Sequence, residues 1–289
     1  MKKLLVLSGK GGTGKTTVTA SFIRFAGAKA FADCDVDAPN LHLVTAKTAE
    51  PMQMDYYGSD KAVIDPQKCV GCSLCAEHCR FDAIRQEGSV CTVDEYACEG
   101  CGVCQFVCPQ KAVSMQMDVA GRLELYLDEN VFATAELKMG RGNSGKLVSE
   151  VKKCMAQAAP EAELAIIDGS PGIGCPVIAS VSGVDMVLIV AEPSCAGLSD
   201  LMRLLKTTRL FETKAAVCVN KYDVCPEQAE TIRRFCGEND VPFVGFLPYD
   251  RQASAAINAG RSVADVDCPL RDALKRAFEA TMKLLEEDA

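Results

Sequence analysis

Short apolar runs alternate with amphipathic segments along most of the chain, and this pattern predicts strands that alternate with helices. Residues 2–8 form a first apolar run, and a helical spacing of apolar positions follows from about Lys15 to Phe25. Further apolar runs lie at 28–35, 163–168, 185–192, 215–220 and 241–246, and helical segments separate the last three. Strands of this kind occur in parallel sheets covered by helices on both faces, so we expect an α/β fold with a mainly parallel sheet.

The alternation is interrupted between residues 55 and 118, where short strand-like runs, glycines and cysteines replace the long helices. The interruption follows the second predicted strand, which indicates a small domain inserted into a larger one. The predicted division is therefore 1–58, 59–118 and 119–289, with the first and last segments forming one nucleotide-binding domain.

Composition narrows the class of protein. The chain has 289 residues, a formal net charge of -8 and 17 cysteines. An acidic chain lacks the basic face of a nucleic-acid-binding protein. No apolar run reaches the length of a membrane span, and the N-terminus has no signal-peptide pattern. We therefore expect a cytoplasmic protein without a nucleic-acid or membrane partner, whose clustered cysteines bind metal or do redox work rather than form disulfides.

A phosphate-binding loop follows the first strand. Residues 9–16 read GKGGTGKT, which fits G-x-x-x-x-G-K-[ST] between a predicted strand and a predicted helix. In such loops backbone N–H groups surround the phosphates, Lys15 reaches the terminal phosphates, and the Thr16 hydroxyl ligates Mg²⁺. The alternative is a glycine-rich turn without a ligand. The residues predicted to bind nucleotide here are Gly11, Gly12, Thr13, Gly14, Lys15, Thr16 and Thr17.

Two cysteine runs share the spacing C-x₂-C-x₂-C-x₃-C, one at 69–79 and one at 98–108. The pair resembles a bacterial-type ferredoxin with two [4Fe–4S] clusters, in which the fourth cysteine of each run ligates the other cluster. Zinc is the alternative, but structural zinc sites usually pair two C-x₂-C units across a longer gap. The resemblance implies one cluster on Cys69, Cys72, Cys75 and Cys108, and another on Cys79, Cys98, Cys101 and Cys104.

Lys10 sharpens the interpretation of the phosphate loop. The sequence KGGTGKT resembles the variant phosphate loop of the MinD/ParA/Mrp superfamily of ATPases, to which the nitrogenase iron protein is related. DVDAPNLHL, NSGKLV and DGSPGIGCPV follow in the order expected for that superfamily. The resemblance implies a homodimer, or a heterodimer with a related ATPase, in which Lys10 reaches the nucleotide of the partner. The alternative is a solvated surface lysine.

Acids at the ends of strands complete the predicted site. Asp168 ends an apolar strand, where a carboxylate that organises Mg²⁺ belongs in a sheet of this kind. The resemblance implies that Asp33 supports the Mg²⁺ shell and that Asp35 orients the attacking water. It also implies that Asn220 and Pro248 bind adenine, although residues 220–223 match the guanine-binding pattern N-K-x-D as well.

Cys175 lies seven residues after Asp168, in the predicted second switch segment. A cysteine at the matching point of the nitrogenase iron protein ligates a cluster shared across a dimer, so a redox or metal role is one reading. The stretch KMGRGNSGKLV holds no second cysteine, and two copies of Cys175 supply only two thiolates. Core packing or anchoring of the switch is the other reading.

Three functions follow from these motifs. The main expectation is an ATP-hydrolysing, Mg²⁺-dependent iron–sulfur protein, in which dimer closure drives electron transfer to a partner or assembly of a metal cofactor on it. The first alternative is a metal or iron–sulfur carrier of the Mrp type. The second is a partitioning-type ATPase whose clusters are structural.

Overall fold

The computed structural model describes residues 1–45 and 49–287. It divides into two compact units, the first comprising Met1–Gln53, Leu123–Glu136 and Ser144–Ala289, and the second Met54–Arg122 and Leu137–Asn143. The second unit thus begins before residue 59, extends beyond residue 118 and includes a short segment of the following chain.

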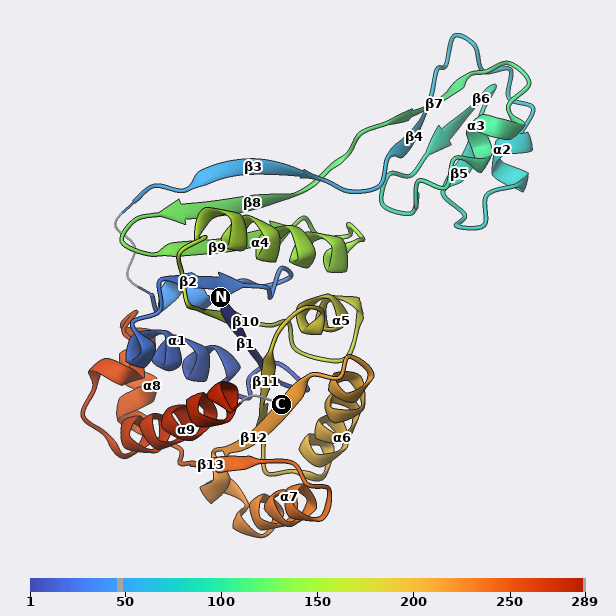
Figure 1. Cartoon of the computed structure of the whole chain (residues 1–289). Coiled ribbons are helices and arrows are strands. Elements are labelled where there is room, and N and C mark those ends of the chain that lie inside the picture. Colours follow the sequence, from blue (N-terminus) through green and yellow to red (C-terminus); the bar gives the residue numbers. More distant parts are fainter. Residues whose placement is uncertain (46–48, 288–289) are drawn as a thin grey trace. The chain divides into compact units, whose positions relative to one another are not determined.

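The first unit is built on a mainly parallel sheet of order β13-β12-β11-β1-β10-β2-β9-β8-β3 (Figure 1). Five adjacent pairs, from β13 to β2, are parallel, and β2 also pairs with β9 in parallel. The strands are β1 (Lys2–Leu7), β2 (Ala30–Asp33), β3 (Met52–Tyr57), β8 (Val119–Leu127), β9 (Val131–Leu137), β10 (Leu164–Asp168), β11 (Met186–Ala191), β12 (Lys214–Asn220) and β13 (Phe243–Leu247).

Helices cover both faces of this sheet, which explains why its central strands are apolar throughout. Figure 1 shows α1 and α9 on one face and α5 and α6 on the other. All six residues of β11 are buried, and so are the last four of β1. The helices are α1 (Lys15–Ala26), α4 (Ser144–Ala158), α5 (Cys175–Val181), α6 (Cys195–Leu210), α7 (Pro226–Glu238), α8 (Arg251–Asn258) and α9 (Pro269–Glu286).

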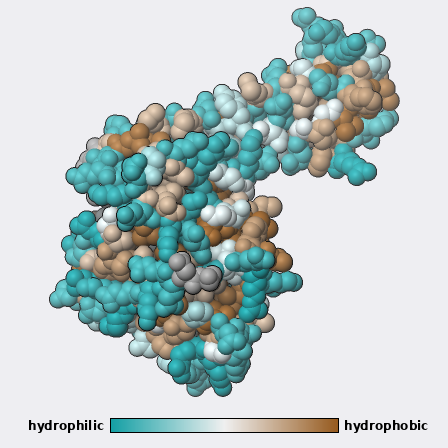
Figure 2. Space-filling model, in the orientation of Figure 1, coloured by the Kyte–Doolittle hydropathy of each residue, from teal (hydrophilic) through white to brown (hydrophobic). Residues whose placement is uncertain are grey.

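The core beneath α1 and α9 is continuous. Phe22 of α1 and Phe278 of α9 pack edge to face at 5.2 Å between ring centroids, and Leu274 is fully buried beside them. The α9 segment is thus a core helix, as its apolar spacing predicts. Among the described residues, no helix is both long enough and apolar enough to span a bilayer. In Figure 2, hydrophilic side chains cover much of the visible face and separate the exposed apolar patches.

The second unit has its own small core, formed largely by cysteines and aliphatic residues. Its two antiparallel pairs are β4 with β7 and β5 with β6. Each cysteine run contains a short helix, α2 in the first run and α3 in the second. The bounds are β4 (Lys61–Ile64), α2 (Leu74–Glu77), β5 (Ile84–Glu87), β6 (Val90–Val93), α3 (Val103–Val107) and β7 (Val113–Gln116).

Candidate functional site

The order of the central strands brings the phosphate loop and two acids to one edge of the sheet. Register pairs Asp168 with Val6 of β1 on one side and with Asp33 of β2 on the other. The loop between β1 and α1 leaves from the same end of β1. The carboxyl ends of parallel strands form the usual ligand-binding edge of such sheets, so the motifs converge where chemistry is expected.

The loop itself needs glycine. Gly14 precedes α1 with φ 92°, a backbone region that side chains disfavour. A Cβ built there would lie 2.2 Å from Nδ2 of Asn220. That Nδ2 donates a hydrogen bond of 2.7 Å to the carbonyl of Thr13. The amide of Asn220 therefore braces the phosphate loop, and it also lines the adjoining cavity.

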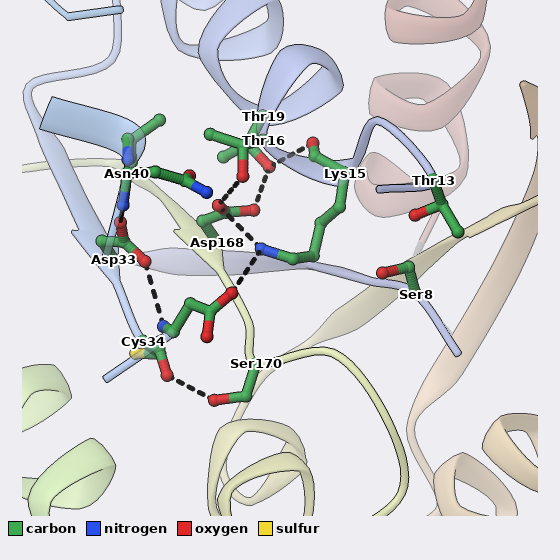
Figure 3. A network of polar contacts seen from close by, with 12 residues as sticks. Ser8, Thr13, Lys15, Thr16, Thr19, Asp33, Cys34, Asn40, Asp168 and Ser170 are labelled. Atoms are coloured by element: carbon green, nitrogen blue, oxygen red, sulfur yellow. Dashed lines mark hydrogen bonds and ion pairs between the residues drawn. The ribbon is translucent and has the colours of Figure 1, made fainter. Parts of the chain in front are cut away.

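Lys15 points into the centre of the site (Figure 3). Its side chain is 6% exposed, and its Nζ lies 2.8 Å from Oδ2 of Asp168 and 3.9 Å from Oδ2 of Asp35. Despite that short distance, Nζ makes no hydrogen bond of good geometry among the described residues. An ammonium has three donors, so Lys15 retains donors for anionic oxygens in the cavity that it lines.

Asp168 is the hub of the polar network in Figure 3 and is fully buried. Thr16 donates a hydrogen bond of 2.7 Å to its Oδ2, and Thr19 donates one of the same length to its Oδ1. The predicted Mg²⁺ residues Thr16 and Asp168 are thus in direct contact. A hydroxyl and a carboxylate are oxygen donors of the kind that Mg²⁺ prefers.

Asp33 is placed differently. Its Oδ1 accepts the N–H of Asp35, and its Oδ2 accepts the N–H groups of Asn40 and Leu41 at 2.9 Å. Both oxygens therefore hold the loop that follows β2 (Figure 3). The carboxylate of Asp35 instead lies near the ammonium of Lys15. Asp35 and Asp37 both line the cavity.

Crowding of these acids alters their protonation. Burial, and after it the charge of Asp168, raises the pKa of Asp33 to about 7. Burial also raises the pKa of Asp35 to about 6, with Lys15 acting in the opposite direction. For Lys15, burial lowers the pKa, but the attraction of Asp168, Asp33 and Asp35 outweighs it and the pKa is raised. The site is thus prepared for a cation that neutralises the carboxylates.

The two loops beside the phosphate site are joined. Ser170, in the segment after β10, donates a hydrogen bond of 2.5 Å to the carbonyl of Cys34, as Figure 3 shows. Gly172 in the same segment has φ 96° and donates its N–H to the carbonyl of Ser8. A change in one loop therefore acts directly on the other and on the phosphate loop.

Lys10 is half-exposed and forms an ion pair with Glu192, which follows β11. Ser194 donates a hydrogen bond of 2.8 Å to Oε1 of the same carboxylate. Burial alone raises the pKa of Glu192, but the bonds from Lys10 and Ser194 outweigh it and the pKa is lowered. Lys10 thus has a charged partner within its own chain.

A cavity of about 960 Å³ adjoins the phosphate loop and extends toward the C-terminal part of the sheet. Its far end includes Leu43, Val44, Pro248, Tyr249 and Ile257, which offer apolar contacts to a planar base. Oδ1 of Asp223 accepts the N–H of Tyr249 at 2.8 Å. That bond commits one oxygen of the acid that the guanine-binding pattern would require.

The second unit gathers the cysteines of the two runs into two separate cavities. One cavity is lined by Cys69, Cys72, Cys75 and Cys108 together with Cys91, and the other by Cys79, Cys98, Cys101 and Cys104. The fourth cysteine of each run thus lies with the first three of the other. Cys75, Cys98 and Cys104 are buried, whereas Cys72 and Cys101 are exposed.

No group of three or more His, Cys, Asp or Glu side chains among the described residues is arranged to hold a single metal ion. Cys175 is exposed at the first residue of α5, and its backbone carbonyl lies 3.2 Å from the position of a Cβ on Gly145. The carbonyl therefore leaves little room for a side chain at position 145 in the first turn of α4.

Sequence reasoning missed Thr19 and Glu192. Thr19 lies one helical turn after Thr16 and is fully buried. That i, i+3 spacing of two threonines behind a phosphate loop is a signal that both face the same strand end. Glu192 follows the last residue of an apolar strand, as Asp168 ends one, but its pairing with Lys10 depends on the sheet order.

The sequence of residues 4–263 matches the protein-family model of the CobQ/CobB/MinD/ParA nucleotide binding domain. The chain belongs to this family. The CobQ/CobB/MinD/ParA match includes residues of both units. The phosphate loop and the polar network of Asp168 lie within the matched residues.

Two curated proteins that are similar to this chain come from Methanocaldococcus jannaschii. "Uncharacterized protein MJ0578" is 32% identical over 96% of this chain and 95% of its own length. "Uncharacterized ATP-binding protein MJ0547" is 25% identical over 98% of this chain and 87% of its own length.

Solved structures show the same fold. The septum site-determining protein MinD complexed with Mg-ADP, from Pyrococcus horikoshii, has a TM-score of 0.60 at 18% identity, covering 99% of this chain and 97% of its own. The cell division ATPase MinD of Pyrococcus furiosus has a TM-score of 0.58 at 19% identity, covering 98% and 99%. The expected α/β fold with a mainly parallel sheet is confirmed.

Proposed function

We propose that the chain is a Mg²⁺-dependent ATPase of the MinD/ParA type that carries two [4Fe–4S] clusters in its second unit. The observation that carries the ATPase assignment is the placement of Lys15, a buried cation with unused donors at the phosphate end of a cavity of about 960 Å³. A triphosphate supplies anionic oxygens for the donors that Lys15 leaves unused.

In this proposal ATP lies with its phosphates on the loop from Gly11 to Thr16. Backbone N–H groups and the start of α1 stabilise their negative charge. The apolar end near Tyr249 receives the base, and the bond between Asp223 and Tyr249 favours adenine over guanine. Asp35 lies on the cavity wall near Lys15, where it accepts a hydrogen bond from the attacking water and orients it.

The donor set fits Mg²⁺. Thr16 and Asp168 present a hydroxyl and a carboxylate 2.7 Å apart. When bound there, Mg²⁺ neutralises charge on the transferring phosphoryl group. Thr19 and Asp33 orient the surroundings instead, because Thr19 holds the second oxygen of Asp168 and Asp33 holds the loop that carries Asp35.

Dimer closure gives Lys10 its function in this proposal. A lysine on the phosphate loop of one chain stabilises the transition state on the other, as an arginine finger does. Both homodimers and heterodimers with a related ATPase satisfy this requirement. Lys10 must first leave Glu192, so the ion pair marks the state before closure.

The two cysteine cavities support the cluster assignment. Each contains four cysteines in the sets that a two-cluster ferredoxin uses, including the exchanged fourth cysteine. A single ion needs donors that converge to about 2.3 Å from one point. A cubane has four irons, each bound to one thiolate, so its cysteines stand farther apart. Sites that could not hold one ion therefore still fit a cubane.

The curated relatives and solved structures named above are not described as iron–sulfur proteins, so the clusters rest on the cavities alone. Bound clusters would supply one-electron chemistry. The main proposal is that ATP binding and dimer closure control electron transfer to a redox partner, or assembly of a metal cofactor on a partner protein. Cys175 is exposed at the start of α5 and belongs to no group of metal-binding side chains within residues 1–45 and 49–287, so this proposal assigns it no cluster.

A partitioning-type ATPase with structural clusters is the second candidate, and similarity to MinD structures favours it. The carrier of the Mrp type is less well supported, because the chain lacks a C-x-x-C pair late in its sequence.

Three measurements separate these functions. The anaerobically purified chain should hydrolyse ATP only with Mg²⁺, and Lys15→Ala should abolish the activity. Electron transfer from the dithionite-reduced chain to a co-purified partner should change between no nucleotide and a non-hydrolysable ATP analogue. The partitioning candidate predicts two other results. Electron transfer has the same rate without nucleotide and with the analogue, and Cys101→Ala keeps its ATPase activity and its binding to the partner.

A further inference from the structure

The first cysteine cavity contains one more cysteine than the second. Cys91 belongs to neither run, yet it lines the cavity with Cys69, Cys72, Cys75 and Cys108. The other cavity is lined by its four run cysteines and by apolar residues such as Met115, with no fifth cysteine in its lining. The two sites are therefore chemically different.

The hairpin of β5 and β6 places Cys91 in this wall. Cys91 pairs with Gln86 across the hairpin and is 4% exposed. Its backbone N–H donates to Sγ of Cys69 over 3.4 Å. A strand residue whose N–H contacts a ligand sulfur has its own side chain held close to that ligand, because the strand is fixed by its ladder.

Cys91 also shares its cavity with a second ligand, Cys75. Both side chains belong to the small core of the second unit. Cys91 therefore contacts one of the four cysteines assigned to the first cluster and shares a buried core with another.

We propose that Cys91 is a reserve ligand of the first cluster, able to take the iron of Cys75 when that ligand is lost. The inference rests on the proposed clusters. The exchange is a substitution at iron: the bond to the Cys75 sulfur breaks and a bond to the Cys91 sulfur forms. The proton of Cys91 passes to the released thiolate or, where Cys75 is absent, to solvent. No oxidant or reductant is consumed.

The repeat within the second unit supplies a matched control. Cys75 and Cys104 are both the third cysteine of their runs, and each is 8% exposed. Cys104 has no fifth cysteine in its cavity. Loss of Cys75 and loss of Cys104 are therefore equal in chemistry and burial, and they differ in whether a reserve thiol is present.

The test uses the full chain, reconstituted anaerobically with ferrous iron and sulfide. Iron and sulfide per chain are measured, with EPR spectra of the dithionite-reduced protein. The wild type and Cys91→Ala should hold about eight irons, and Cys75→Ala should also hold about eight. Cys104→Ala and the double variant Cys75→Ala/Cys91→Ala should each fall to about four.

The outcomes separate the two claims. A wild type without iron overturns the clusters themselves. The wild type can hold about eight irons while Cys75→Ala falls to about four, as Cys104→Ala does. This result overturns the role of Cys91 as a reserve ligand and leaves the clusters in place. Should Cys75→Ala not fold, judged by circular dichroism and gel filtration, Cys69→Ala makes the same comparison, since Cys91 contacts Cys69. The double variant Cys75→Ala/Cys91→Ser is compared with Cys75→Ala. An EPR spectrum that differs between the two shows that the residue at position 91 binds the cluster. Identical spectra contradict the proposal.

Discussion

Lys10 forms an ion pair with Glu192 of its own chain, and Ser194 holds the same carboxylate by a hydrogen bond of 2.8 Å. The lysine of the phosphate loop is therefore already engaged before any partner arrives. Exposed ion pairs contribute little stability, so this contact is weak enough to exchange. Its importance lies in where it holds the cation.

Removal of Lys10 should separate hydrolysis from binding. We expect Lys10→Ala to lower the ATPase rate by roughly 10³-fold, because the cation that stabilises the transferring phosphoryl group is lost. Nucleotide affinity, measured by fluorescence titration, should change little. Lys275→Ala, which removes an exposed lysine from α9, is the control. Normal turnover in Lys10→Ala rules out the role across the dimer.

Neutralising Glu192 should have the opposite effect. In Glu192→Gln, Lys10 loses its charged partner and is free to reach a second chain. The protein concentration that gives half-maximal ATPase activity should fall roughly two- to fivefold, the range expected for an exposed ion pair. Glu230→Gln, which breaks the exposed pair with Arg233 on α7, should leave that concentration unchanged. An equal response of both variants removes Glu192 from the account.

Thr19 should matter although it lies outside the phosphate motif. Its hydroxyl is buried and donates to Oδ1 of Asp168, so Thr19→Val leaves that oxygen without its partner. Hydrogen bonds to charged groups contribute roughly 1.5–3 kcal/mol. Thr19→Val should lose stability in this range and bind Mg²⁺-ATP less tightly, as measured by thermal unfolding and by calorimetric titration. Thr19→Ser should restore both the stability and the affinity for Mg²⁺-ATP. If Thr19→Ser is as unstable and binds as poorly as Thr19→Val, the loss comes from packing of the methyl group and not from the hydrogen bond.

The fold was largely predictable because its signals are local. The apolar runs mark strands that are buried on both faces, and α1 begins at Lys15 as the phosphate motif predicts. The hairpin of β8 and β9 was not predicted, although Leu123 and Leu125 alternate with the polar Arg122 and Glu124 in β8. Helix α5 was also not predicted, because its seven residues start at Cys175 directly after a glycine-rich segment.

The site was predictable in its membership more than in its contacts. Lys15, Thr16 and Asp168 meet because their motifs follow adjacent strands. The role of Asp33 in the Mg²⁺ shell stays a prediction, and its contacts with three backbone N–H groups could not be predicted from the sequence. Those groups come from a loop whose conformation no side-chain pattern reveals. The contact of Cys91 with Cys69 likewise depends on strand pairing.

The acids of the site should make stability depend on pH. The pKa of Asp35 is raised from 3.8 to about 6, chiefly by burial. The folded chain thus binds this proton more tightly than the unfolded chain does. The stability from this group is complete below pH 3.8 and is lost as pH rises through about 6. Asp33 extends the loss to about pH 7.

Without nucleotide and Mg²⁺, the unfolding temperature should therefore fall between pH 5 and pH 8, by roughly 2–4 °C for each kcal/mol lost. The unfolding temperature of Asp35→Asn should fall less over the same pH interval. Saturating Mg²⁺-ATP should reduce the fall of the unfolding temperature in the wild type. A wild type and an Asp35→Asn variant with parallel curves would contradict the assignment to this carboxylate.

Metal analysis of the chain purified without oxygen from its native host tests the central claim most directly, because both the cluster sites and the function built on them depend on it. The account predicts about eight irons and about eight acid-labile sulfides per chain, with Cys101→Ala reduced to about half of each. Zinc in place of iron, or a chain that contains no metal at all, would contradict it.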